Sequence, residues 1–357
     1  MSKKNNSPEI TVEKFDPLNG SDSEWERYHE FRRLKHMEEN PNDPLSSDEF
    51  AKNSMQQNVQ NPEFGIHLSS VIDSSTNKQI GEIMQGLILE ASPSYEGAKH
   101  LIQFDIYLLK PYRRKGIGTR LLKQVNDFAV EHNKKLLVTG SDNKDGKAFL
   151  KTISAQVALS GVDSRLQLKN VDWKMIDSWA KEGPKKSPES SLEIVQKIPE
   201  ELLEEFCKVY TEVTNQQPFG ELDIGAIVFT PESYRSMEEM FEKMNRTWIT
   251  IISKESDGKI SGLTEMRYNP ERTTMISQIL TGVQLEYRGR GIGKWLKAAM
   301  LLYVREKYPE VNIITTGNAT TNAPMLSINN RLGFKVHKES VGAQITIDQL
   351  AKYFDSL

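Results

Sequence analysis

The pattern of hydrophobic and polar positions predicts strands and amphipathic helices that recur in the two halves of the chain. Residues 101–108 and 275–283 are rich in β-branched and aromatic side chains, which is typical of strands. Each is followed by apolar residues at the three-to-four-residue spacing of a helix. These are Leu121, Leu122, Val125 and Ala129 in the first half and Leu296, Ala299, Met300 and Tyr303 in the second. One strand–loop–helix segment therefore occurs twice.

The surroundings of the two segments also match in order, which predicts a duplicated domain. A strand, two helices and a turn fall at 10–12, 24–37, 47–60 and 74–78 and again at 192–195, 200–210, 232–245 and 255–259. Gly81 and Gly262 follow the two turns at equivalent places. The polar run 181–191 lies between the halves. We therefore predict an N-terminal domain over 1–183, a linker over 184–191 and a C-terminal domain over 192–357.

The loop between strand and helix carries the pattern Arg-x-x-Gly-x-Gly in both copies, 175 residues apart. Backbone N–H groups at a helix N-terminus favour an anion such as phosphate, and glycine permits close approach. A glycine turn that only links strand to helix is the alternative, but two copies in equivalent contexts favour the phosphate site. The spacing fits neither an ATPase loop nor a dinucleotide fingerprint. The predicted cofactor-binding residues are Arg113, Arg114, Lys115, Gly116, Ile117 and Gly118, and Arg288, Gly289, Arg290, Gly291, Ile292, Gly293 and Lys294.

On these loops, and on the Asn-led segment 318–334 that ends in Leu-Gly-Phe, the chain resembles the GNAT (Gcn5-related N-acetyltransferase) superfamily. Its tandem layout is similar to that of mycothiol synthase-like two-domain acetyltransferases. The resemblance implies an α+β fold (mixed α/β) of two tandem domains, each a mixed, mostly antiparallel twisted sheet flanked by helices. It also implies acetyl-CoA as acyl donor, whereas the expectation of no metal rests on the histidine and cysteine pattern.

The resemblance further implies roles for residues of the second half. Asn322 would hydrogen-bond the pantetheine or phosphate arm with help from Asn318, whereas a turn and a helix N-cap are the alternative for these two residues. Backbone groups near Thr281, Gly282 and Val283 would bind pantetheine and polarise the thioester carbonyl. The first half lacks the Leu-Gly-Phe ending. We therefore expect a degenerate N-terminal domain and catalysis in the C-terminal domain.

Catalytic side chains are harder to place than the cofactor loop. The position of the catalytic glutamate in some family members falls at Ser277, and the nearest acid is Glu265 on the preceding strand. Glu265 is the candidate base, with Thr281 as a second catalytic candidate; a solvated residue or an ion pair with Arg267 is the alternative for Glu265. Asn329 stands where many members have the general-acid tyrosine, and an amide cannot deliver a proton in the same way. Either the thiolate leaves unaided, or Tyr268, Tyr303 or water replaces that acid.

Side chains outside the loops are expected to be structural. Cys207 shares an apolar helical face with Leu203 and Phe206. Trp173 and Trp179 are expected to pack a helix at the domain junction, with the wall of the first domain's cleft as the alternative. The six histidines show no metal-ligand spacing.

Composition narrows the classes of partner. Lys plus Arg number 46 against 49 Asp plus Glu, a net charge of −3, which argues against a nucleic-acid surface. No apolar run is long enough for a bilayer, residues 1–8 lack a signal-peptide pattern, and the single cysteine suits a reducing compartment. We expect a cytoplasmic monomer or homodimer, with no nucleic-acid or membrane partner, that acetylates a small-molecule amine. The alternatives are two active domains or a non-catalytic acyl-CoA-binding module.

Overall fold

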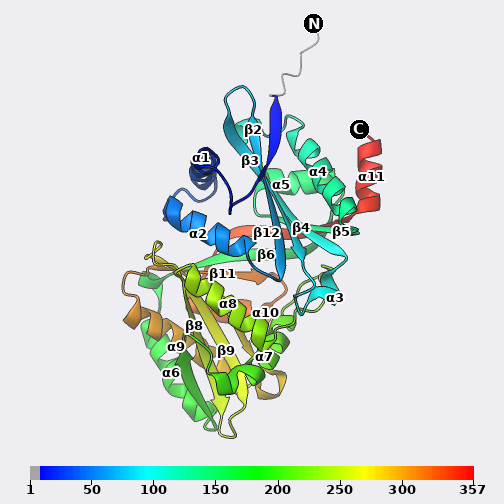
Figure 1. Cartoon of the computed structure of the whole chain (residues 1–357). Coiled ribbons are helices and arrows are strands. Elements are labelled where there is room, and N and C mark those ends of the chain that lie inside the picture. The colour runs from blue at the N-terminus through cyan, green and yellow to red at the C-terminus, as the bar shows by residue number, and fades with distance from the viewer. Residues whose placement is uncertain (1–8) are drawn as a thin grey trace. The chain divides into compact units, whose positions relative to one another are not determined.

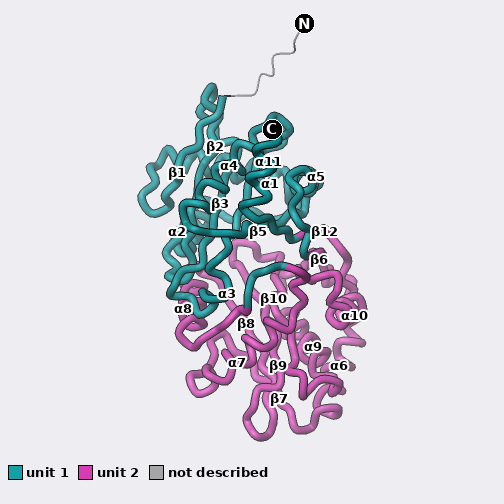
Figure 2. Tube along the Cα trace, turned by 90° about the vertical axis from the view of Figure 1, so that its right-hand side faces the viewer, with its two compact units in different colours: residues 1–158, 222–225, 342–357 teal, residues 159–221, 226–341 magenta. Residues whose placement is uncertain are grey.

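The computed structural model describes residues 9–357, which form two compact units of strands and helices (Figures 1 and 2). Unit 1 comprises the chain up to Ala158 together with Leu222–Gly225 and Gly342–Leu357. Unit 2 comprises Leu159–Glu221 and Ala226–Val341. The mixed, mostly antiparallel sheets flanked by helices confirm the predicted fold class. The N-terminal stretch used to argue against a signal peptide lies outside the described residues.

Unit 1 builds its sheet in the strand order β1-β2-β3-β4-β5-β12, antiparallel from β1 to β4 and parallel between β4 and β5. Its elements are β1 (Ile10–Phe15), α1 (Asp22–Glu39), α2 (Asp48–Val59), β2 (Phe64–Asp73), β3 (Lys78–Ile88), α3 (Tyr95–Ala98), β4 (Leu101–Leu108), α4 (Ile117–Glu131), β5 (Leu136–Ser141), α5 (Lys144–Thr152) and α11 (Ile347–Asp355). The predicted apolar stripe of α4 is confirmed, because Leu121, Leu122, Val125 and Ala129 are fully buried.

Unit 2 repeats this plan in the strand order β6-β11-β10-β9-β8-β7, with β10 and β11 parallel. Its elements are β6 (Gln156–Gln167), α6 (Trp173–Lys186), β7 (Ser190–Val195), α7 (Glu200–Asn215), α8 (Pro231–Lys243), β8 (Thr247–Glu255), β9 (Ile260–Tyr268), β10 (Met275–Val283), α9 (Ile292–Lys307), β11 (Ile313–Ala319), α10 (Ala323–Leu332) and β12 (Lys335–Thr346). Helices α6 and α9 share one apolar cluster with the sheet, and α7 and α8 share another. Cys207 is buried in the second cluster.

Two strands pass from one unit to the other. β6 begins in unit 1 at 156–158 and continues in unit 2, where α6 follows it. β12 begins in unit 2 and ends in unit 1 at 342–346, where α11 follows it. Each repeat therefore gives its last strand and helix to the other unit. The stretch 184–191, expected as a linker, holds the end of α6 and the start of β7, and the predicted boundaries 1–183 and 192–357 stay a prediction.

The parallel strand pair of each unit separates after a short ladder. β4 pairs with β5 only from Leu101–Gln103 to Leu136–Val138, and β10 pairs with β11 only from Met275–Ser277 to Ile313–Thr315. Within residues 9–357, the rest of β4 and the rest of β10 therefore have no strand partner on that side. Unsatisfied backbone groups on such an edge can bind an extended ligand. The β9–β10 register also shifts between Gln278 and Thr281, the mark of a β-bulge in unit 2.

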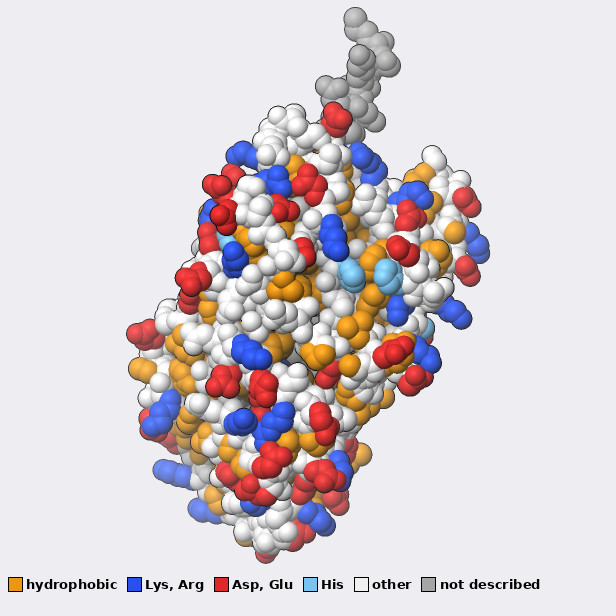
Figure 3. All heavy atoms as spheres, viewed as in Figure 1, with side chains coloured by type: hydrophobic (Ala, Val, Ile, Leu, Met, Phe, Trp, Pro, Cys, Tyr) orange, Lys and Arg blue, Asp and Glu red, His pale blue; other side chains and the backbone are white. Residues whose placement is uncertain are grey.

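The near-balance of acidic and basic residues in the composition is also visible on the surface (Figure 3). On the face shown in Figure 3, acidic and basic side chains are interspersed and neither sign forms a continuous field. No helix among residues 9–357 is long and apolar enough to cross a membrane.

Candidate active site

The two predicted loops have the same backbone conformation, residue for residue. Arg113 and Arg288 are extended, with φ of −73° and −68°. Arg114 and Gly289 then take positive φ values of 61° and 82°. Gly116 and Gly291, with φ of 77° and 85°, cap α4 and α9 in the left-handed region that favours glycine. The sequence repeat is therefore a structural repeat.

Each loop presents the free N–H groups of a helix N-terminus. The first N–H groups of α4 and α9 have no acceptor within their helix, and the dipole makes this end positive. Gly118 leaves ordinary space, since an added Cβ would lie 3.7 Å from the Phe149 ring, and at Gly293 the nearest atom would be at 3.8 Å. Ile117 and Ile292 are 1 % exposed, so only their backbone faces the loop. Both loops suit a phosphate.

The loop arginines turn back toward the strand instead of reaching outward. Arg113 Nε donates to the Leu108 carbonyl at 2.7 Å, and Arg288 Nε donates to the Val283 carbonyl at 3.1 Å. Arg113 also binds Asp145 at 3.0 Å and Glu38 at 3.2 Å. These arginines join the end of the strand to the start of the loop, so the backbone and Arg114 are left to face an anion in the first copy.

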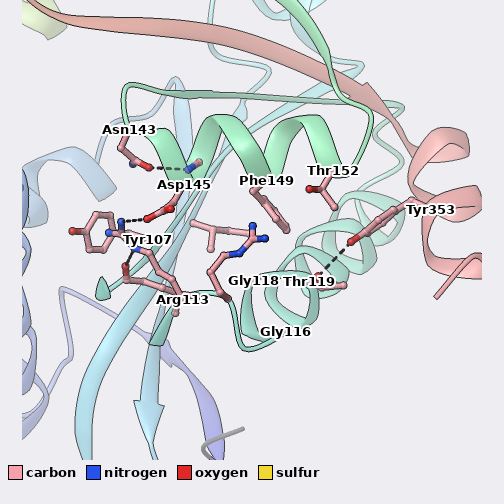
Figure 4. Close-up of a pocket in the computed structure, with 14 residues that line it drawn as sticks. Tyr107, Arg113, Gly116, Gly118, Thr119, Asn143, Asp145, Phe149, Thr152 and Tyr353 are labelled. Carbon is pink, nitrogen blue, oxygen red and sulfur yellow. Dashed lines mark hydrogen bonds and ion pairs between the residues drawn. The ribbon is translucent and has the colours of Figure 1, made fainter. Parts of the chain in front are cut away.

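A cavity of about 350 Å³ opens beside the first loop (Figure 4). It is lined by β4, the loop with Arg114 and Gly116, the start of α4, helix α5, and Tyr353 of α11. Asn143 also lines it and caps α5 by accepting a hydrogen bond from the Gly146 N–H at 2.8 Å. Asn322 caps α10 in the same way, by accepting from the Met325 N–H at 3.3 Å. Asn143 is therefore the unit 1 counterpart of Asn322, which the sequence did not indicate.

The second loop is bound more closely by its own unit. Arg290 donates to Ser190 Oγ at 3.0 Å and pairs with Glu255 at 2.9 Å. Lys294 lies over the Trp179 ring at 5.7 Å. A Cβ at Gly282 would collide with Val213 of α7, so α7 packs directly on the predicted pantetheine strand. Arg290, Lys294 and Gly282, which the sequence predicted to bind the cofactor, therefore make packing and polar contacts within unit 2.

Glu265, the predicted base, is fully buried. Its carboxylate accepts hydrogen bonds from Tyr210 Oη at 2.9 Å and Tyr234 Oη at 3.1 Å. Burial raises its pKa to about 7, against the opposing effect of Arg267 and the hydroxyl donors. The solvated alternative does not hold, and direct contact with substrate would require this cluster to open. Its catalytic role stays a prediction.

The other predicted side chains of unit 2 belong to two separate hydrogen-bonded groups. Thr281 Oγ1 lies 2.7 Å from Thr264 Oγ1. Asn329 Nδ2 donates to Asn318 Oδ1 at 2.8 Å, and Asn329 Oδ1 accepts from Lys297 Nζ at 3.2 Å. Burial lowers the pKa of Lys297 to about 7. Asn329 is thus held in a buried network with a lysine that the helix pattern alone could not single out.

A set of charged groups that sequence reasoning missed lies on α1, β3 and β4 of unit 1. Lys35 Nζ pairs with Glu82 at 2.8 Å, and both line a second cavity of about 230 Å³. Burial raises the pKa of the nearby Asp105 against the effect of Lys35, and Glu82 adds to the rise. Asp105 precedes Ile106, which lines the larger cavity. The sequence did contain one signal for this set, because Asp105 is an acidic residue in the strand that precedes the first loop.

Comparisons with known proteins agree with this geometry. The model of the Acetyltransferase (GNAT) family matches residues 55–153, which include the first loop. No curated protein matches the chain. Among solved structures, a tandem GNAT protein from the clavulanic acid biosynthesis pathway is similar, at 19% identity and a TM-score of 0.74 over 95% of this chain and 99% of that one.

Two further structures share the fold. A GCN5-related N-acetyltransferase from Sphaerobacter thermophilus has 13% identity and a TM-score of 0.61, covering 95% of this chain and 96% of its own. Saccharomyces cerevisiae N-myristoyltransferase with bound myristoyl-CoA has 12% identity and a TM-score of 0.57, covering 95% of this chain and 78% of its own. Among residues 9–357 no cluster of three or more His, Cys, Asp or Glu could hold a metal. Residues 55–153, with the first loop, thus match the acetyltransferase (GNAT) family model, and the chain over 95% of its length shares its fold with a tandem GNAT protein.

Proposed function

We propose that the protein is an acetyl-CoA-dependent N-acetyltransferase that acetylates a small-molecule amine and holds its acyl donor in unit 1. The observation that carries this proposal is the cavity of about 350 Å³ between the first loop and the separated edge of β4. Its floor offers helix N–H groups for a diphosphate, and its strand offers backbone groups for an extended pantetheine arm. The C-terminal site expected from the sequence is more closely packed around Gly282 and Arg290.

The residues of unit 1 supply what amine acetylation needs. A thioester is attacked by a neutral amine, so a base must take the proton of the ammonium form. Asp105 is the carboxyl group that we assign to this step, because it lies on β4 two residues before Tyr107, which lines the larger cavity, it interacts with Lys35 and Glu82, which line the smaller one, and burial raises its pKa. Free N–H groups of the β4 edge would polarise the thioester carbonyl.

Unit 1 has no tyrosine at the position where the family resemblance places the general acid that would protonate the departing thiolate. Leu150 lies seven residues after Asn143, the cap of α5, just as Asn329 lies seven residues after Asn322, the cap of α10. Leu150 is apolar and 5 % exposed. A thiol has a pKa of about 8.5, so its thiolate is a moderate leaving group near neutral pH. The transfer therefore does not require a side-chain acid at this point.

Catalysis in unit 2 is the second candidate. The bulge in β10 between Gln278 and Thr281 releases backbone groups from the ladder, and the second loop has the same conformation as the first. In that case Glu265 would act from its buried cluster with Tyr210 and Tyr234, or Thr281 from its pair with Thr264, and unit 1 would hold an acyl-CoA without turning it over.

A matched pair of substitutions tests the assignment. Gly118→Asp and Gly293→Asp each place a carboxylate in the first turn of the loop helix, where the dipole tolerates it and the Cβ has room. Both variants should fold, and each should repel the diphosphate in its own unit. Release of CoA thiol from acetyl-CoA would be followed across a broad panel of small amines.

We expect Gly118→Asp to lower kcat/KM for acetyl-CoA by at least about 10-fold, the effect of roughly 1.4 kcal/mol of lost binding, and Gly293→Asp to leave it close to wild type. The reverse result would place catalysis in unit 2, and loss in both variants would indicate two active domains. Stoichiometric acetyl-CoA binding by calorimetry without thiol release from any amine would favour the non-catalytic module.

A further inference from the structure

The helices that the two repeats exchange carry an aromatic residue at the same position. α11 begins after the N-cap Thr346 and α6 after the N-cap Asp172. Tyr353 and Trp179 are each the seventh residue beyond their cap. Both rings lie next to the third residue of the loop helix of their unit, Thr119 of α4 or Lys294 of α9. Trp179 therefore lies in unit 2 and lines no part of the unit 1 cavity described above.

In unit 1 this aromatic residue belongs to the wall of the donor cavity. Tyr353 Oη lies 3.4 Å from Thr119 Oγ1, and Phe149 and Thr152 of α5 line the same part of the cavity. Figure 4 shows Tyr353 beside Thr119 and Thr152, away from Tyr107, Asn143 and Arg113. The loop N–H groups lie between these two ends of the lining.

In unit 2 the equivalent space is taken up by cationic side chains. Lys294 replaces Thr119, and Arg331, the ninth residue after the cap of α10, replaces Thr152, the ninth after the cap of α5. Lys294 lies 5.7 Å and Arg331 5.1 Å from the Trp179 ring. In unit 1 the two threonines leave the Tyr353 end of the cavity open, whereas in unit 2 the two long cationic side chains cover the Trp179 ring.

We propose that Tyr353 and Phe149 bind the adenine ring of the acyl donor in unit 1, so that the last helix of the chain completes the donor site of the first repeat. This inference rests on the proposed acyl-CoA site. With the diphosphate on the N-terminus of α4 and the pantetheine arm along β4, the nucleotide leaves the diphosphate toward Thr119, where Tyr353 and Phe149 offer aromatic surface. A nucleobase stacks on such rings whatever its hydrogen-bonding edge.

The test compares donors with and without the nucleotide. Tyr353→Ala should raise KM for acetyl-CoA about 10-fold, as expected for the loss of one stacking partner, and leave kcat unchanged. KM for S-acetylpantetheine, which lacks the nucleotide, should not change. Tyr353→Phe should behave as wild type with both donors, because it keeps the ring. Trp179→Ala is the matched variant in unit 2 and should leave KM for acetyl-CoA unchanged.

Binding of adenosine 3′,5′-bisphosphate, followed by calorimetry, tests the same site without any transfer reaction. We expect Tyr353→Ala to weaken its binding about 10-fold and Tyr353→Phe to preserve it. The adenine assignment is overturned if Tyr353→Ala binds this nucleotide as wild type does, or if it raises KM equally for both donors. Absence of acetyl-CoA binding and of thiol release in the wild type would instead overturn the proposed function.

Discussion

At the scale of single residues, burial decides what each carboxyl group can do. Glu265 is fully enclosed and bonded by Tyr210 and Tyr234, whereas Asp105 is half-buried and interacts with the charges of Lys35 and Glu82. Both pKa values are raised chiefly by burial. The first arrangement suits a structural polar cluster and the second suits a group that meets substrate. The two residues therefore predict different consequences on substitution.

Glu265→Gln is expected to change the pH dependence of stability. The folded-state pKa of Glu265 is about 7 against 4.5 for the unperturbed group, so the unfolded state releases its proton first. The wild type should lose stability as pH rises through this range, by about 3 kcal/mol near pH 8, and below pH 4.5 the residue should cost nothing. Urea unfolding of wild type and variant at several pH values measures the difference. A constant difference between pH 4.5 and 8 would contradict the prediction.

Asp105→Asn is expected to lower kcat by about 100-fold or more, the usual contribution of a general base. Asp105 must be deprotonated to accept a proton, so wild-type activity should rise with pH through a pKa above the ordinary value of 3.8. The variant should lose this acidic limb of the pH–rate profile. Glu96→Gln, which removes an exposed carboxylate of α3, is the control and should keep the profile. An unchanged limb in Asp105→Asn would remove it as the base.

At the scale of elements, the packing of α6 on α9 depends on a missing side chain. A Cβ at Gly183 would collide with the Trp295 indole. Gly183→Ala should therefore destabilise unit 2 by about 1–3 kcal/mol through overpacking, although alanine is the better helix former by about 1 kcal/mol. Gly118→Ala, whose Cβ meets Phe149 at an ordinary 3.7 Å, should change stability by less than about 0.5 kcal/mol. Denaturant unfolding curves of the wild type and the two variants measure these changes in the free energy of unfolding. A loss of stability in Gly183→Ala shows that overpacking outweighs helix propensity, and a gain shows the reverse.

The elements also show what the sequence can and cannot predict. The spacing of Leu121 to Ala129 predicted α4 because one apolar face must be buried. Arg-x-x-Gly-x-Gly predicted both loops because glycine at a helix N-terminus permits close approach of an anion, and the structure adds the positive φ of Gly116 and Gly291. Periodicity does not say which strand a strand will pair with, so the exchange of β6 and β12 was not predicted. The burial of Glu265 depends on Tyr210 and Tyr234 of two distant helices, which alternation along one strand cannot reveal.

At the scale of the whole molecule, the repeats in the sequence and the compact units are not the same segments. Unit 1 includes 342–357, where Ala343, Ile345 and Leu350 are at most 1 % exposed. A fragment cut at the predicted boundary, 1–183, lacks these residues and leaves α4 without α11. The apolar surface that α11 covers would then meet water, at a cost of roughly 25 cal/mol per Å².

We therefore expect the fragment 1–183 to lack a cooperative thermal transition. A second fragment, 1–158 joined through a Gly/Ser linker to 342–357, carries the exchanged strand end and helix and should melt cooperatively. Circular dichroism followed against temperature compares the two, and the full chain provides the reference. If 1–183 melts cooperatively and the joined fragment does not, the first repeat folds as the contiguous domain that its sequence suggests, and α11 contributes little to its stability. The opposite result would make the last helix of the chain part of the first domain's core, which the adenine assignment to Tyr353 also requires.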